Sequence, residues 1–362
     1  MRLLISGGGT GGHIYPALAL AEGLKQAIPD SEFLFVGAQG GLEEKIVPAA
    51  GYRLKTLNIS GLDRRSPRKA IASVFKIPSA LREARRLVKE LKPDVVVGTG
   101  GYASFPVLYA ASRQGIPTAI HEQNAYPGIV NRFLASRVDL VMLTFAEAGD
   151  RLKAKRLVTT GLPVREAVLK ASEKRRNHKN SRENQVFTLL AFGGSLGAQV
   201  INQAVWELVS KLPEDFRVIW VTGRATYNEW QEKLQSIPGL GGQVDIHPYL
   251  DDIEIAMAAS SLALCRAGAS TLAELTIMGL PALLIPYPHA AENHQEKNAR
   301  ALETAGGAHV IINAELNGQR LMDEILAVKS QLGAMALAMR AQSTPNARQQ
   351  MVALISDLGG IR

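Results

Sequence analysis

Short apolar runs alternate with amphipathic stretches along most of the 362 residues of the chain. The runs have the length of buried strands, whereas the stretches between them repeat apolar residues at helical spacing. This alternation predicts an α/β fold in which helices cover both faces of parallel sheets. The predicted strands are 3–5, 33–36, 95–97, 118–120, 140–143, 157–159, 186–192, 218–221, 244–246, 262–264, 282–285 and 309–311. The predicted helices are 17–25, 81–91, 106–111, 129–134, 205–209 and 346–358.

A glycine-rich stretch, SGGGTGGH from Ser6 to His13, follows the first predicted strand, and the next helix is expected to begin near Tyr15. Glycine permits tight turns with positive φ and leaves the main-chain N–H groups open to a ligand. The N-terminus of the following helix directs further N–H groups and the positive end of its dipole to the same place. The stretch therefore predicts a phosphate or diphosphate site. A tight connection without a ligand is the simpler alternative.

Two later stretches repeat this order of strand, glycine loop and helix, namely Gly98–Tyr102 (GTGGY) and Gly193–Gly197 (GGSLG). Because glycine loops open both halves of the chain, we expect two similar α/β domains with ligands beyond the carboxyl ends of the strands. Three such loops suggest a cleft that handles a diphosphate and a second phosphorylated molecule. The polar stretch 170–183 is expected to be a solvated loop or a fraying helix end.

The spacing of Gly7, Gly9 and Gly12 also fits the fingerprint of a nicotinamide-binding domain. Such a domain needs an acidic residue at the end of its second strand, but this strand runs into Gln39. Glu43 comes later, on the next predicted helix. A Walker loop is excluded because no Gly-Lys-Ser/Thr follows, and the chain lacks zinc ligands at useful spacing. A phosphate ligand of another kind is therefore favoured.

The net charge of +8 and the pI near 9.5 point to an anionic partner. Nine basic residues and one acid lie between Arg64 and Lys89, with apolar residues at helical spacing among them. Such a segment suits an anionic membrane surface, but a surface helix with its apolar stripe in the core has the same pattern. Pro67 and Pro78 predict that the segment is not one continuous helix.

The sequence shows neither a signal segment nor a membrane span. No basic stretch followed by an apolar region opens it, and no apolar run approaches the roughly 20 residues that a span requires. We therefore expect a cytoplasmic protein. The single cysteine, Cys265, cannot form an internal disulfide and is expected in the core.

Seven motifs together resemble glycosyltransferase family 28, the bacterial N-acetylglucosaminyltransferases that convert lipid I to lipid II in peptidoglycan synthesis. The resemblance covers nearly the whole chain, and its motifs are GGTGGHIYPALALA, GTGGYAS, HEQNAYPGIVNR, GLPVR, FGGSLGA, CRAGASTLAEL and GLPALLIPYPHAAENHQEKNA. It implies the GT-B architecture, in which two Rossmann-like domains face each other across a cleft. The implied domains are an acceptor and membrane domain at 1–162, a donor domain at 163–341, and a helix at 342–362 that packs back on the first domain.

The resemblance also implies the reaction. N-acetylglucosamine moves from UDP-N-acetylglucosamine to the 4-hydroxyl of the N-acetylmuramic acid sugar of lipid I, with inversion at the anomeric centre. The enzyme must deprotonate a weak nucleophile and neutralise a leaving diphosphate. No D-x-D motif occurs, so we expect no protein-held metal and no other cofactor, although a divalent cation can assist. The implied location is peripheral, on the cytoplasmic face of the bacterial inner membrane, with other cell-wall synthesis proteins as further partners and no nucleic acid.

The resemblance places the two candidate bases at His13 and Glu122. An imidazole has a suitable pKa for this task. It further implies the donor-binding residues Thr10, Gly11, Gly12, Arg165, Gly194, Ser195, Leu250, Ala269, Ser270, Thr271, Glu274, Gln295 and Asn298. The implied acceptor-binding residues are Gly100, Gly101, Tyr102 and Asn124, with His121 as a further group that could orient the acceptor. His294 occupies a position where the family pattern leads us to expect glutamine, which leaves its role open.

Several of these residues also have a structural interpretation. His13 could cap a helix, and the HEQN motif could be a hydrogen-bonded network at a strand end. Arg165 could be an ordinary surface cation. The pair Thr271 and Glu274 fits a capping box, T-x-x-E, whereas the resemblance assigns Glu274 to the ribose hydroxyls.

The lipid-linked acceptor makes the basic segment a reasonable docking surface. The expected membrane-contacting residues are Arg68, Lys69, Ile71, Val74, Phe75, Lys76 and Ile77. Competing functions are another GT-B transferase with a different acceptor, a sugar-nucleotide epimerase on a similar scaffold, and a pure membrane-binding or nucleic-acid-binding module. The last does not explain three glycine loops, and the segment lacks the interleaved aromatic residues of base-stacking surfaces.

Overall fold

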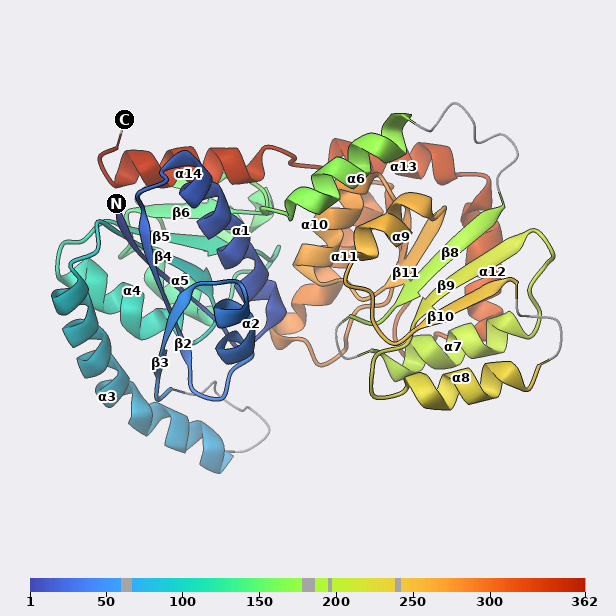
Figure 1. The fold of residues 1–362 in the computed structure, drawn as a ribbon, viewed down its shortest axis with the longest axis horizontal. Helices are drawn as coiled ribbons and strands as arrows, with labels where there is room; N and C mark the ends of the chain where they lie inside the picture. Colours follow the sequence, from blue (N-terminus) through green and yellow to red (C-terminus); the bar gives the residue numbers. More distant parts are fainter. Residues whose placement is uncertain (60–66, 178–185, 195–196, 238–241, 362) are drawn as a thin grey trace. The chain divides into compact units, whose positions relative to one another are not determined.

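A computed structural model describes residues 1–59, 67–177, 186–194, 197–237 and 242–361, with the backbone alone for 67–74. The described chain forms two compact units. The first comprises residues 1–164 and 344–362, and the second residues 165–343. The two units can be followed in Figure 1. The domain limits expected from the sequence, 162 and 341, fall two residues before the observed limits, 164 and 343.

The first unit is built on a seven-stranded parallel sheet with the strand order β3-β2-β1-β4-β5-β6-β7. The strands are β1 (Arg2–Gly7), β2 (Glu32–Ala38), β3 (Arg53–Leu57), β4 (Val95–Gly100), β5 (Thr118–Glu122), β6 (Leu140–Leu143) and β7 (Leu157–Thr159). The central strands are buried on both faces, which explains why their sequences are continuously apolar. This parallel sheet confirms the predicted fold class.

Helices cover both faces of this sheet. They are α1 (Gly11–Ala27), α2 (Glu43–Ala49), α3 (Pro67–Leu91), α4 (Ser104–Arg113), α5 (Ile129–Leu134) and α14 (Ala347–Leu358), with the short helix η1 (Ala146–Arg151). Leu4 of β1 packs with α3, α4 and α5, whereas Leu3 packs with α1 and α14. Successive residues of a strand point to opposite faces, so one strand contributes to both layers. The predicted helix at the C-terminus is thus part of the first unit.

The second unit contains a six-stranded parallel sheet in the order β10-β9-β8-β11-β12-β13. Its strands are β8 (Phe187–Phe192), β9 (Phe216–Val221), β10 (Val244–His247), β11 (Leu262–Cys265), β12 (Ala282–Leu284) and β13 (Ala308–Val310). Its helices are α6 (Glu166–Asn177), α7 (Gln199–Val209), α8 (Tyr227–Gln235), α9 (Ile253–Ala259), α10 (Ala269–Met278), α11 (His294–Thr304), α12 (Gly318–Lys329) and α13 (Leu332–Ala341), with the short helix η3 (Ala291–Asn293). Trp220 and Trp230 are fully buried between β9 and α8, and Cys265 is buried as predicted.

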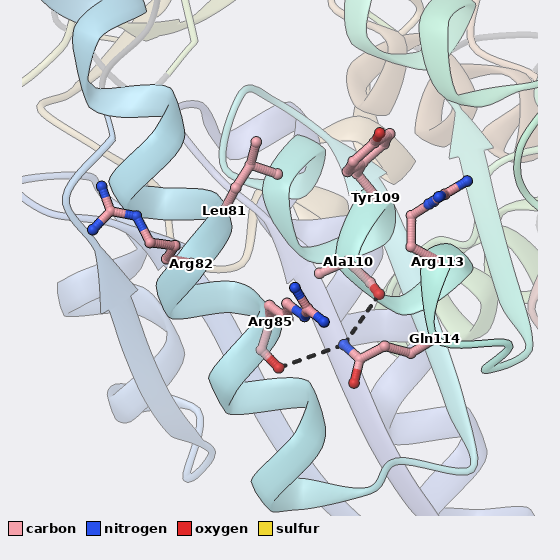
Figure 2. A pocket seen from close by; sticks show the side chains of 7 residues that line it. All are labelled: Leu81, Arg82, Arg85, Tyr109, Ala110, Arg113 and Gln114. Atoms are coloured by element: carbon pink, nitrogen blue, oxygen red, sulfur yellow. Dashed lines mark hydrogen bonds between the residues drawn. The ribbon is translucent and has the colours of Figure 1, made fainter.

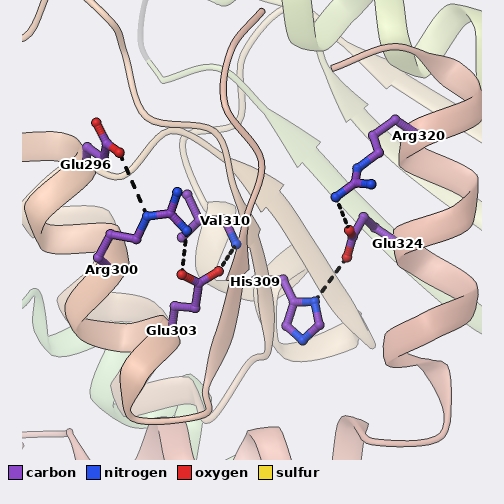
Figure 3. Close-up of polar contacts among 7 residues, drawn as sticks. All are labelled: Glu296, Arg300, Glu303, His309, Val310, Arg320 and Glu324. Atoms are coloured by element: carbon purple, nitrogen blue, oxygen red, sulfur yellow. Dashed lines mark hydrogen bonds and ion pairs between the residues drawn. The ribbon is translucent and has the colours of Figure 1, made fainter. Parts of the chain in front are cut away.

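Polar contacts hold the outer strand β13 between two helices (Figure 3). Glu303 of α11 accepts a 2.8 Å hydrogen bond from the Val310 main-chain N–H and pairs with Arg300. On the other side, the His309 ring lies 3.0 Å from Glu324 of α12. The charged residues near β13 therefore have a structural role.

Two predictions about local structure are wrong, and one strand was missed. Helix α1 begins at Gly11 rather than near Tyr15, so the last glycines of the loop form the first helical turn. Helix α3 is continuous from Pro67 to Leu91. Pro67 is tolerated because it opens the helix, and the helix continues through Pro78 because its later residues are buried against α4 and the sheet. Strand β3, RLKTL, was not predicted because it lies at the sheet edge and alternates charged with apolar residues.

The polar stretch 170–183 is helical as far as Asn177, where α6 ends. It is not uniformly solvated. Arg175 is buried and donates hydrogen bonds of 2.7 to 3.0 Å to the carbonyl groups of Met257, Ala258 and Ser260. The guanidinium therefore supplies hydrogen bonds to carbonyl groups at the C-terminus of α9.

Candidate active site

The first glycine loop is held in place by Glu43, which is buried at the start of α2. Its carboxylate accepts hydrogen bonds from the main-chain N–H groups of Gly9 (3.0 Å) and Ala38 (2.8 Å). A Cβ atom at Gly8 would lie 2.1 Å from this carboxylate, so only glycine fits there. Glu43, which lies too far along the chain to be the acidic residue of a nicotinamide-binding domain, therefore stabilises the glycine loop.

The second glycine loop meets the first at the carboxyl edge of the sheet. Gly7 at the end of β1 is the register partner of Gly100 at the end of β4. A Cβ atom at Gly101 would lie 2.4 Å from the Gly8 carbonyl oxygen, and Gly100 and Gly101 both have positive φ. Glycine at these positions therefore allows two backbones to touch beside the start of α1.

His13 lies in the first turn of α1, where its ring is fixed by the glycine loop. Its Nδ1 atom is 3.1 Å from the Gly8 carbonyl oxygen and 3.3 Å from Thr10 Oγ1. Because a carbonyl can only accept, Nδ1 carries the proton and Nε2 is left as the acceptor nitrogen. Burial lowers the pKa of His13, while the Gly8 carbonyl and Glu43 oppose that shift. The imidazole is therefore neutral at pH 7, the state that a general base requires.

His13 does not cap the helix, because Thr10 is the N-cap residue and no side chain caps it. Thr10 and Gly12 are exposed at this loop, with half-buried Gly11 between them. The Tyr102 ring packs within 3.3 Å of the position that a Gly9 Cβ would occupy. These residues, with Gly100 and Gly101, surround His13, so the structure brings these predicted residues of the first unit together.

The HEQN motif forms a network at the end of β5. The Glu122 carboxylate accepts hydrogen bonds from the Asn124 main chain (3.0 Å) and side chain (3.2 Å), from Gly128 N–H (2.9 Å) and from Asn131 Nδ2 (2.8 Å). Burial raises the pKa of Glu122, and these hydrogen bonds act against the rise. Since both carboxylate oxygens are engaged by their own loop, the geometry favours His13 over Glu122 as the base.

The adjacent residues of this motif are also anchored. His121 Nε2 lies 3.0 Å from the Gly161 carbonyl oxygen, and burial lowers the pKa of His121 to about 4. Gln123 donates from Nε2 to the Thr99 carbonyl at 2.6 Å. The Asn124 side chain, predicted to contact the acceptor, bonds to Glu122.

In the second unit, Arg165 joins two carboxylates. Its Nε atom is 3.2 Å from Glu274 Oε1, and its Nη2 atom is 3.2 Å from Glu254 Oε2. Burial disfavours the charged form, but the two carboxylates raise the pKa of Arg165. Burial also disfavours the charged form of Glu274 and so raises the pKa of its carboxyl group, and Arg165 opposes this rise. Arg165 is therefore a half-buried ion-pair partner rather than an ordinary surface cation.

Helix α10 presents its N-terminus at the carboxyl end of β11. Gly268 is the N-cap residue, and no side chain caps it. The predicted capping box is therefore wrong, because Thr271 is the third helical residue and Glu274 pairs with Arg165. Ser270 Oγ is buried and accepts or donates no hydrogen bond within the described chain. Free N–H groups at Ala269 and Ser270 beside such a hydroxyl are suited to an anion.

The remaining donor-side predictions lie on other loops of this unit. Gly194 is exposed with φ of 88°, and a Cβ at Gly193 would meet the Ala198 nitrogen at 2.2 Å. Ser195 lies outside the described residues, and Leu250 is half-buried between β10 and α9.

Helix α11 carries the last predicted residues. Gln295 Oε1 accepts a 2.9 Å hydrogen bond from Tyr287 N–H, and Asn298 is fully buried with Nδ2 3.5 Å from the Ala267 carbonyl. His294 is the first residue of this helix, and its Nδ1 atom is 2.7 Å from the Ala291 carbonyl oxygen. That contact gives His294 a structural role in closing the preceding turn.

Two residues of the first-unit site were missed in the sequence, Glu43 and Gln123. Glu43 holds the glycine loop from 34 residues away, which no local pattern could indicate. Within the part of the chain that the structure describes, no group of three or more His, Cys, Asp and Glu side chains could hold a metal ion. No helix among the described residues is both long and apolar enough to cross a membrane.

Comparison with known proteins agrees with this architecture. The model of the glycosyltransferase family 28 N-terminal domain matches residues 3–143, and that of the family 28 C-terminal domain matches residues 188–355. A curated protein of Moorella thermoacetica is 45% identical over 98% of this chain and 98% of its own length. A protein of Limosilactobacillus fermentum is 41% identical over 98% of each chain. Both are named UDP-N-acetylglucosamine--N-acetylmuramyl-(pentapeptide) pyrophosphoryl-undecaprenol N-acetylglucosamine transferase.

Solved structures give the same result for the fold. The crystal structure of Acinetobacter baumannii MurG is 28% identical with a TM-score of 0.82, covering 98% of this chain and 99% of that one. The UDP-GlcNAc 2-epimerase of Neisseria meningitidis, solved with UDP-GlcNAc bound, has a TM-score of 0.67 at 15% identity, covering 99% of this chain and 100% of that one. The second likeness concerns the fold alone.

Two Rossmann-like parallel-sheet units, each with a glycine loop and an uncapped helix N-terminus at its sheet edge, define a glycosyltransferase of the GT-B class. The chain belongs to glycosyltransferase family 28, in the group that includes MurG. It is a hexosyltransferase, as the sequence resemblance predicted.

Proposed function

We propose that the protein transfers N-acetylglucosamine from UDP-N-acetylglucosamine to the 4-hydroxyl of the N-acetylmuramyl sugar of lipid I, forming lipid II with inversion at the anomeric carbon. The observation that carries the proposal is the near full-length similarity to relatives named as this transferase. The chemistry of the described site supports it from the residues upward.

On the acceptor side, His13 is the group suited to accept the hydroxyl proton. Its Nδ1–H is committed to the Gly8 carbonyl, so the lone pair of Nε2 is available. As the proton moves to Nε2, the hydroxyl oxygen attacks the anomeric carbon of the sugar. The bond from that carbon to the diphosphate oxygen breaks on the opposite face, and UDP leaves with both electrons. One displacement of this kind inverts the anomeric centre.

On the donor side, the leaving diphosphate takes the electron pair of the broken bond and gains one negative charge that must be stabilised. The N-terminus of α10 offers unpaired N–H groups, and the buried Ser270 hydroxyl adjoins them. The glycine loop at Gly193 and Gly194 adds main-chain donors without side chains in front of them. Backbone donors and a helix dipole can perform this role where other transferases use a bound metal. We further propose that Glu274, oriented by Arg165, accepts hydrogen bonds from the ribose hydroxyls.

Membrane contact is proposed for the α3 face of the first unit. Phe75 of α3 is 79% exposed, although large aromatic side chains are normally buried. Ile77 and Lys76 beside it are half-buried, while the side chains of Arg68, Lys69, Ile71 and Val74 lie outside the described residues. An exposed aromatic residue on a helix rich in basic residues suits the boundary of an anionic bilayer.

A basic pocket on the same face supports this proposal (Figure 2). It has a volume of about 360 Å³ and lies between α3 and α4. The pocket is lined by Leu81, Arg82, Arg85, Tyr109, Ala110, Arg113 and Gln114. Gln114 Nε2 donates hydrogen bonds to the carbonyl oxygens of Ala110 (3.1 Å) and Arg85 (3.4 Å) and so links α4 to α3. The three arginine side chains attract anionic headgroups. We therefore propose a peripheral protein of the cytoplasmic membrane face that works beside other cell-wall synthesis proteins.

The experiment that tests the proposed reaction supplies labelled UDP-N-acetylglucosamine and a lipid I analogue. The expected product is labelled disaccharide lipid. A donor-only reaction serves as the control for hydrolysis and for epimerisation, the chemistry of the enzymes that share the fold. Release of UDP without disaccharide, or epimerised sugar, would overturn the acceptor assignment while leaving the donor site in place.

A further inference from the structure

Gln123 is a buried residue of the HEQN motif to which neither the sequence resemblance nor the proposed reaction gives a role. Only 2% of it is exposed. Its Nε2 atom donates to the Thr99 carbonyl at 2.6 Å and lies 3.2 Å from both the His121 carbonyl oxygen and His121 Nδ1. A rotation that exchanged the amide atoms would set an oxygen against two carbonyl oxygens, so this orientation of the carboxamide is chemically fixed.

The other end of the carboxamide has no partner. Gln123 Oε1 is fully buried and accepts no hydrogen bond from any residue that the structure describes. A buried carbonyl oxygen without a donor is unfavourable, and such atoms are rare in folded proteins. The surrounding structure nevertheless holds it in place through three contacts at Nε2.

The unpaired oxygen lies on the His13 side of the second glycine loop. A Cβ atom at Gly100 would be 3.0 Å from His13 Nε2 and 3.3 Å from Gln123 Oε1. The same virtual atom would be 2.7 Å from His13 Cδ2. Both polar atoms therefore lie within 3.3 Å of one point, which a side chain at position 100 would occupy. Thr99 adds a direct link, because it accepts from Gln123 and donates through Oγ1 to the His13 carbonyl at 2.8 Å.

We infer that Gln123 is a positioning residue for His13, whose Oε1 accepts the Nε2–H bond of the imidazolium that forms when His13 takes the proton of the acceptor hydroxyl. The inference rests on the proposed function in that His13 is the base. In the neutral ring, Nδ1–H bonds to Gly8 and Nε2 carries no proton. After proton transfer both ring nitrogens are donors: the Gly8 carbonyl remains the acceptor for Nδ1, and in the proposed arrangement Gln123 Oε1 accepts from Nε2.

Among the described residues, the other polar side chains near His13 already have partners of their own. Glu43 is the facing carboxylate, but its oxygens accept from Gly9 and Ala38. The ring of Tyr102 packs against Gly9, and His121 is turned toward Gly161. Glu122 is held by the loop of residues 124–131. Gln123 Oε1, in contrast, is a buried acceptor without a donor in the described part of the chain.

The direct test measures the pKa of His13 in the folded protein without substrates, from the pH dependence of its imidazole signals in nitrogen and carbon NMR. A His13→Asn sample identifies the signals. The variant Gln123→Met keeps the side-chain length and removes the acceptor, and it should lower the pKa of His13 by about 0.5 to 1 pH unit. The variant Gln123→Glu places a carboxylate there and should raise the pKa of His13, while its second oxygen faces the Thr99 and His121 carbonyls and should lower the melting temperature. Gln350→Met and Gln350→Glu, at an exposed position of α14, should leave the pKa of His13 unchanged.

A pKa of His13 that is the same in the wild type, Gln123→Met and Gln123→Glu would overturn the inference, provided that the NMR spectra show folded proteins. The acidic limb of the kcat/KM profile gives the second readout. It should move in the same directions, whereas loss of a merely structural contact would lower the rate without moving the limb. If the NMR pKa shifts and the kinetic limb does not, Gln123 contacts the His13 imidazolium but His13 is not the base, and the catalytic part of the inference is overturned.

Discussion

The main chain of Gly101 touches the main chain of Gly8, since a Cβ atom added at Gly101 would lie 2.4 Å from the Gly8 carbonyl oxygen. This contact joins two glycine loops that are more than 90 residues apart in sequence and places His13 beside the HEQN motif. The loops therefore form one site rather than two separate connections.

Replacing Gly101 with alanine should disrupt this contact. The φ of 81° strains any residue with a side chain, and the added carbon would also collide with backbone, so we expect a loss of about 2 to 4 kcal/mol in unfolding free energy. Gly115→Ala is the matched control, because φ is 70° with nothing within 4 Å, and it should cost about 1 kcal/mol. Urea denaturation compares them. Equal losses would show that the loop contact contributes nothing.

Replacing His13 with asparagine should remove the base. We expect kcat to fall by about 10² to 10⁴, with the affinity for UDP-N-acetylglucosamine within twofold of wild type. Glu122→Gln should instead lower the melting temperature, because the carboxylate that accepts four hydrogen bonds is lost, and should keep kcat within about tenfold. Steady-state kinetics and donor titration separate the two. A larger loss of kcat in Glu122→Gln would transfer the role of base to Glu122.

The pH dependence of stability should report His121. Its pKa is about 4 in the folded protein and near 6.5 when unfolded, so the unfolded chain binds more protons between these values. Stability contributed by the neutral ring is complete above pH 6.5 and is lost as the pH falls toward 4. Between pH 7 and pH 5 this loss is about 2 kcal/mol. His121→Gln should show a shallower dependence in urea denaturation, and identical slopes would contradict the burial argument.

Replacing Glu274 with glutamine should weaken donor binding. A hydrogen bond to a charged acceptor contributes about 1.5 to 3 kcal/mol, so the Kd for UDP-N-acetylglucosamine should rise about 10- to 100-fold. Glu254→Gln is the matched control, because it removes the other carboxylate that pairs with Arg165. Calorimetric titration should place the control within about threefold of wild type. Equal weakening in both variants would indicate that Glu274 acts only through Arg165.

Replacing Phe75 with aspartate should reduce binding to vesicles that contain anionic lipid by about tenfold or more, because an apolar contact of about 1.5 to 3 kcal/mol is lost. Leu337→Asp is the control, since Leu337 is 63% exposed in the second unit. Donor affinity should remain unchanged in both. Unchanged sedimentation of Phe75→Asp with the vesicles would refute the docking surface.

The α/β architecture was predictable because strands buried on both faces are continuously apolar, as β4 with its run VVVG illustrates. The glycine loops were predictable from composition at strand ends. Strand β3 was not, because an edge strand needs only one apolar face. The roles of Glu43, Arg175 and Gln123 could not be predicted either. Each role depends on a partner that the fold brings close. The local sequence around a polar residue does not show whether that residue will be buried.

The most direct test of the proposed function counts products in a single reaction with UDP-N-acetylglucosamine and a lipid I analogue. We expect one molecule of β-linked disaccharide lipid for each UDP released, with a loss of both in His13→Asn. UDP release without disaccharide lipid, or an epimerised sugar in its place, would contradict the proposed function.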